Sequence, residues 1–156
     1  MNGSRIGKIA LALWGVTVVA TGLYVIRGGN VAQQTNGTRQ AILLSQSDRE
    51  MVLSEMRTML ASTQQIVDGL AHEDMAQVAN AAKAAGMGSA IDLDPNFLSK
   101  LPLEFKTLGF GMHSDMDAIS KAANSGASSK DISSMLSATL SKCVGCHSAW
   151  ELKIKP

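Results

Sequence analysis

Residues 128–147 read SSKDISSMLSATLSKCVGCH, and this stretch decides how the rest of the chain is interpreted. Its apolar residues recur at spacings of three and four, which predicts an amphipathic helix. Cys143 and His147 are four residues apart, so they share one face of that helix, and Cys146 flanks the same side. One helical surface can therefore present two thiols and an imidazole together.

The last five residues of this stretch, CVGCH, have the attachment pattern of a c-type haem. In that chemistry each thiol adds to a haem vinyl group, and the histidine ligates the iron. The sequence thus predicts one covalently bound haem c, held by Cys143, Cys146 and His147, with His147 as an iron ligand. Covalent attachment of this kind takes place on the outer side of the bacterial inner membrane or in an equivalent compartment.

Other uses of a Cys-x-x-Cys pair stay open. A thioredoxin-like redox pair belongs beside a βαβ pattern, and the sequence shows no strand pattern. A closed structural zinc site needs four ligands. His72 and His113 could complete one, although their spacing matches no zinc module. A plain disulfide would leave the histidine that follows the second cysteine unexplained.

The composition favours a small helical domain. The 156 residues allow one modest domain plus an extension. Only 4% of the residues are aromatic, and Ala, Met and Leu are plentiful, which suits helices better than sheets. The formal net charge of +1 argues against nucleic acid as a partner. No acid–base pair, nucleophile elbow or phosphate loop accompanies the haem pattern, so we do not expect an enzyme.

The amino-terminal segment predicts a membrane anchor. Residues 9–26 form a run of eighteen uncharged residues, which spans about 27 Å as a helix. Arg5 and Lys8 precede the run, and positive charge there keeps that end in the cytoplasm. We expect 1–27 to be a single-pass anchor in the bacterial inner membrane, with the carboxy-terminal domain in the periplasm. A signal peptide cleaved after Ala20 is the alternative, but the apolar run continues beyond that site.

After the anchor, residues 28–46 predict a flexible linker, because Gly, Asn and Gln give the segment no periodicity. Residues 47–156 predict an all-α domain, an antiparallel four-helix bundle that holds the haem. Ser47, with Glu50 three residues later, has the spacing of a capping box. The predicted helices cover approximately 47–70, 73–85, 103–123 and 128–147. Gly109 and Gly111 weaken the third of these and indicate close packing there, as against a flat ligand.

The order of these helices, with CVGCH near the end of the sequence, resembles the cytochrome c′ family. The resemblance covers about residues 47–154. Softer support comes from the Ala-rich stretch MAQVANAAKAAG at 75–86 and from LPLEF at 101–105. It implies that His147 is the proximal iron ligand and that the distal position lies on the first helix of the bundle.

The distal residue decides the function that the resemblance implies. Aligning the first helix puts Met56, in EMRTML, at that position, with Met59 as the next candidate. Family members with methionine there are six-coordinate and transfer electrons, whereas members with a non-ligating side chain are five-coordinate and bind small gases. Val52 stands where the family commonly has an arginine, so no propionate partner is identified. His113 is expected at the surface or beside a propionate rather than at the iron.

The sequence therefore predicts a membrane-anchored monohaem c-type cytochrome, with His147 and Met56 as axial ligands, that transfers single electrons on the periplasmic side. Its expected partners are redox proteins of a respiratory chain. A gas-binding protein for nitric oxide or carbon monoxide, and an accessory haem subunit of a respiratory membrane complex, are the alternatives. A homodimer and a subunit of a larger complex are both compatible with the sequence.

Overall fold

The computed structural model describes residues 3–27, 29, 31–32, 38–90 and 93–155. Within these ranges the chain is mostly helical, as predicted. The elements in chain order are α1 (Gly3–Arg27), β1 (Val31–Ala32), β2 (Gln40–Leu44), α2 (Gln46–Ala71), α3 (Met75–Ala84), the short 3-10 helix η1 (Met87–Ser89), α4 (Pro95–Ser99), α5 (Leu103–Asn124), α6 (Ser129–Ala149) and β3 (Trp150–Ile154).

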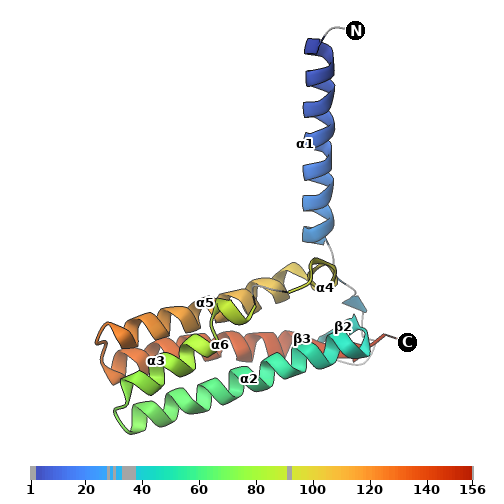
Figure 1. The fold of residues 1–156 in the computed structure, drawn as a ribbon. Helices are drawn as coiled ribbons and strands as arrows, with labels where there is room; N and C mark the ends of the chain where they lie inside the picture. Colours follow the sequence, from blue (N-terminus) through green and yellow to red (C-terminus); the bar gives the residue numbers. More distant parts are fainter. Residues whose placement is uncertain (1–2, 28, 30, 33–37, 91–92, 156) are drawn as a thin grey trace.

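Helix α1 extends away from the other helices and meets them at α4 (Figure 1). Its segment Gly7–Tyr24 is long and apolar enough to cross a membrane, and no residue of that segment is buried in the structure. The predicted apolar amino-terminal helix is therefore confirmed. A signal sequence would show the same length and composition, so this finding by itself does not distinguish an anchor from a signal.

Helices α2, α3, α5 and α6 lie alongside one another (Figure 1). Helix α3 packs against both α2 and α5, and α5 packs against α6. Gly69 lets α2 approach α3 closely, because a Cβ there would lie 2.9 Å from a methyl group of Val78. The fully buried side chains Ile66, Val78, Met116, Ile119 and Ile132 belong to the larger apolar core between these helices.

Serine side chains cap α2 and α6 at their amino ends, where backbone N–H groups lack partners. Ser128 caps α6 as its spacing predicts, since the N–H of Asp131 donates to its hydroxyl at 3.2 Å. Helix α2 begins earlier than predicted. Ser45 caps it in place of Ser47, with the N–H of Asp48 donating to the Ser45 hydroxyl at 3.1 Å.

A small sheet joins the two ends of the domain, which the all-α prediction missed. Strand β2 pairs with β1 in antiparallel fashion and with β3 in parallel fashion, so that Ile42 lies opposite Leu152. Ala41, Ile42 and Leu44 are buried. The predicted linker at 28–46 therefore contains a strand that is part of the core. Its partner β3 lies near the other end of the sequence, so no local pattern indicated the pairing.

This sheet shortens the expected connection to α1, because β1 starts four residues after the end of α1. Residues 28, 30 and 33–37 of the predicted linker lie outside the described residues.

A second, smaller apolar core lies where the sheet meets the helices. It contains Ile42 and Leu44 from β2 together with Phe97, Leu101 and Phe105. The rings of Phe105 and Trp150 meet edge to face, with centroids 6.5 Å apart. Met56 and Cys146 pack against this core from α2 and α6. The unpredicted strand thus supports residues that the sequence analysis singled out.

Candidate cofactor site

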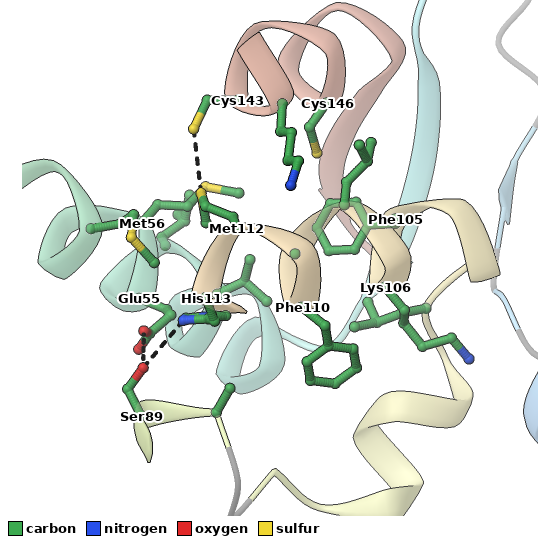
Figure 2. Close-up of a pocket in the computed structure, with 18 of the residues that line it drawn as sticks. Glu55, Met56, Ser89, Phe105, Lys106, Phe110, Met112, His113, Cys143 and Cys146 are labelled. Atoms are coloured by element: carbon green, nitrogen blue, oxygen red, sulfur yellow. Dashed lines mark hydrogen bonds between the residues drawn. The ribbon is translucent and has the colours of Figure 1, made fainter. Parts of the chain in front are cut away.

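A cavity of about 580 Å³ lies between α2, α4, α5 and α6. Its volume falls in the range of small-molecule and cofactor sites, about 300–1,000 Å³. Its walls are mainly apolar. All four predicted site residues line it, namely Met56, Cys143, Cys146 and His147. Figure 2 shows Met56 on a different helix from the one that carries the two cysteines. The fold therefore brings the distal candidate and the CVGCH segment to one place.

The wall formed by α6 carries the two cysteines and the histidine. Both cysteines are free and half-buried, and His147 is exposed in the last turn of the helix. The thiol of Cys143 lies 3.3 Å from the sulfur of Met112 and donates a weak hydrogen bond to it. The thiols therefore border the cavity, while the imidazole lies where the cavity reaches the surface.

The surroundings of the thiols keep them protonated. Burial raises the pKa of Cys143, and burial followed by the neighbouring charge of Cys143 raises the pKa of Cys146. Both residues lie in the carboxy-terminal half of α6, where the helix dipole also disfavours a thiolate. A reactive redox pair has the opposite property, a lowered thiol pKa. This setting argues against the thioredoxin-like interpretation of the pair.

The described part of the chain contains no complete zinc site. No group of three or more His, Cys, Asp or Glu side chains converges there to hold a metal ion. His72 lies at the carboxyl end of α2, where its Nδ1 is 2.9 Å from the carbonyl oxygen of Asp68. It is not among the residues that line the cavity.

The wall formed by α2 distinguishes the two distal candidates. Met56 is half-buried and packs against the smaller core. Met59 also borders the cavity, but it is only 5% exposed and belongs to the larger core. Met56 is therefore freer to direct its sulfur into the cavity, whereas Met59 already has a packing role.

The wall formed by α5 is unusually open at Gly109. This glycine lines the cavity, and a Cβ added to it would meet no atom within 4 Å. A Cβ on Gly111 would lie 3.4 Å from the ammonium nitrogen of Lys142. Gly109 thus leaves room for a flat ligand, whereas Gly111 accommodates the side chain of Lys142 from α6.

An ion pair fixes α6 against α5 beside the first cysteine. The ammonium group of Lys142 donates to the carboxylate of Asp115 at 2.5 Å and to the carbonyl oxygen of Gly111 at 3.3 Å. Lys142 directly precedes Cys143 and also borders the cavity. The local sequence pattern does not predict this pair, because its two residues lie on different helices.

A polar cluster at the cavity wall was also missed. His113 is buried, which shows that its expected surface position is wrong. Its Nδ1 lies 2.9 Å from the carbonyl oxygen of Ala85 and 3.3 Å from the hydroxyl of Ser89, which itself donates to Glu55 at 3.2 Å. The spacing of residues in the sequence did indicate that His113 is buried. His113 lies three residues before Met116, so it continues the buried row of α5.

Comparison of the chain with protein-family models, with curated proteins and with solved structures found no match. The function is therefore inferred from the chain's own residues and their arrangement.

Proposed function

We propose that this protein is a membrane-anchored monohaem c-type cytochrome that transfers single electrons. In this proposal α2, α3, α5 and α6 form an antiparallel four-helix bundle of the cytochrome c′ type. One observation carries the proposal. The CVGCH segment and Met56, which are far apart in the sequence, line the same apolar cavity. A cavity between facing helices is where bundles hold their cofactors.

The residues of the cavity fit a covalently bound haem. Cys143 and Cys146 would each add an S–H group across a vinyl double bond. A sulfur–carbon bond forms, the thiol proton goes to the other vinyl carbon, and no oxidant is needed. This addition uses reduced cysteines, and neither Cys143 nor Cys146 is in a disulfide. His147 from α6 and Met56 from α2 are the side chains that would hold the iron.

Held by His147 and Met56, a haem would have a raised reduction potential and would supply one-electron chemistry to the protein. The chain contributes the surroundings. Leu101, Phe105 and Leu108 line the cavity with apolar side chains. Apolar, fixed surroundings would reorganise little when the charge of a bound haem changes, which favours fast transfer of a single electron.

Electrons need a route to a partner, and the surface near His147 offers one. His147 is exposed, and its neighbour Val144 is 67% exposed. From residue 28 onward the chain has eleven basic and thirteen acidic residues, so no strong overall charge steers an encounter. We expect small, transient contacts with redox proteins of a respiratory chain, of the kind that weak electron-transfer complexes make.

The proposed location is the bacterial inner membrane with the haem domain in the periplasm. Support comes from the apolar segment Gly7–Tyr24, preceded by Arg5, and from the compartment in which haem c is attached. The short connection between α1 and β1 would keep the domain beside the bilayer and raise its effective concentration near membrane-bound partners.

Optical spectra of the detergent-solubilised full chain test the ligation. We expect a weak band at the red end of the ferric spectrum, which marks a bond between a thioether and iron. Met56→Ala should abolish this band. Met51→Ala is the matched control, because Met51 borders the same cavity from the same helix and should leave the band unchanged. A wild-type protein that is already high-spin and binds carbon monoxide at once would contradict electron transfer and favour the gas-binding alternative.

A further inference from the structure

The buried imidazole of His113 is held in one tautomer. The side chain is 6% exposed and borders the cavity. Its Nδ1 lies 2.9 Å from the carbonyl oxygen of Ala85, and a carbonyl oxygen can only accept a hydrogen bond. The hydrogen of the neutral ring therefore resides on Nδ1, and the lone pair resides on Nε2.

This is the arrangement that histidine ligands of metals usually have. Such ligands donate their other ring N–H to a carboxylate, a backbone carbonyl or water, which fixes the ring and makes the free nitrogen a better donor of electrons. The hydroxyl oxygen of Ser89 lies 3.3 Å from the same Nδ1 and 2.9 Å from the carbonyl oxygen of Gly86. His113 on α5 is thus held by a backbone carbonyl, that of Ala85, and by a side chain, that of Ser89, from the segment around η1.

His113 also lies near the predicted distal residue. Ser89 donates to the carboxylate of Glu55 at 3.2 Å, and Glu55 directly precedes Met56 on α2. A single hydroxyl group therefore connects the imidazole to the turn of α2 that carries Met56. Figure 2 shows Met56 and His113 away from the helix that bears Cys143 and Cys146. Both potential ligands face the cavity from walls other than that of His147.

We infer that His113 is an alternative distal ligand, which binds the iron opposite His147 when the thioether of Met56 is absent. The inference rests on the proposed function, because it requires a haem in the cavity. It gives the site two distal ligands of different softness. An imidazole in place of a thioether lowers the reduction potential.

The test compares ferric spectra, electron paramagnetic resonance and carbon monoxide uptake in full-chain variants. Met56→Ala should lose the thioether band but stay low-spin, with a reduction potential below that of the wild type. Met56→Ala combined with His113→Gln should be high-spin and bind carbon monoxide at once. Glutamine can still donate to the carbonyl of Ala85, so the double variant keeps that hydrogen bond. Met56→Ala combined with His72→Ala is the control and should behave as Met56→Ala alone.

A Met56→Ala protein that is already high-spin, and that does not differ from the double variant, would overturn the inference. Met56→Leu, which nearly preserves the side-chain volume, serves as the same test if the alanine variant does not fold. The proposed function fails in a different way, through a wild-type chain without covalent haem. A wild-type chain that is low-spin, lacks the thioether band and becomes high-spin in His113→Gln would support ligation by His113 while contradicting ligation by Met56.

Discussion

Substitution of Gly109 should have opposite effects on the protein with and without its cofactor. Gly109 lies in the interior of α5, lines the cavity and has no atom within 4 Å of an added Cβ. Glycine in a helix interior is about 1 kcal/mol less favourable than alanine or leucine. In the haem-free protein, Gly109→Leu should therefore raise the free energy of unfolding by about 1 kcal/mol, or the melting temperature by roughly 4 °C.

With haem bound, the leucine side chain and the porphyrin would compete for the same space. Overpacking costs about 1–3 kcal/mol, so after the gain in helix propensity the haem-loaded variant should lose up to about 2 kcal/mol. The fraction of chains that carry haem should also fall. Thermal melts followed by circular dichroism, with and without haem maturation, measure both effects.

Gly88→Ala is the matched control for this experiment. Gly88 also has no atom within 4 Å of an added Cβ, but it lies in η1 and does not line the cavity. Gly88→Ala should change the free energy of unfolding by the same amount in the haem-loaded and the haem-free protein. If Gly109→Leu stabilises the haem-loaded form as much as the haem-free form, and the haem content is unchanged, then the ligand does not occupy this cavity.

Two further predictions concern the fold and the thiols. Ile42→Ala should lower the free energy of unfolding by about 2–5 kcal/mol in urea titrations, because Ile42 is fully buried in β2. Ile154 of β3 is 54% exposed, so Ile154→Ala is the control and should lower the free energy of unfolding by less than about 0.5 kcal/mol. If Ile42→Ala has an effect as small as that of Ile154→Ala, then β2 lies outside the core. Burial raises the pKa of both Cys143 and Cys146 above the value of an unfolded thiol. The folded, haem-free protein is therefore stabilised by its protonated thiols. This stabilisation is complete below the pKa of the unfolded thiols and is lost as the pH rises through the pKa of the folded ones. Urea titrations from about pH 7 to pH 10 should show this decline, and a double Cys→Ala variant with the same decline would refute its assignment to the thiols.

The sequence predicted those features that depend on local spacing. The helices around 47–70 and 128–147 follow from apolar residues three and four apart, and the cap at Ser128 follows from the carboxylate three residues later. The side-by-side placement of Cys143 and His147 needs only the geometry of one helix. Local periodicity therefore sufficed to predict most of the helices and one wall of the cavity.

Features that join distant segments were missed because local spacing carries no information about tertiary contacts. Strand β2 is stable because β3 lies beside it and Phe97 covers it, and neither neighbour is visible from residues 40–44 alone. His113 was expected at the surface or beside a propionate, but a carbonyl group at the end of α3 gives its ring a partner inside the protein. In both cases a tertiary contact overrode the local preference of the chain.

Mass spectrometry of the peptide 143–153 tests the central claim most directly. Trypsin should release this peptide, CVGCHSAWELK, because Lys142 precedes it and Lys153 ends it. The account predicts that, in protein made with haem maturation, the denatured peptide carries the added mass of one haem and that neither thiol reacts with an alkylating reagent. A peptide of unmodified mass, with both thiols free to react, would contradict it.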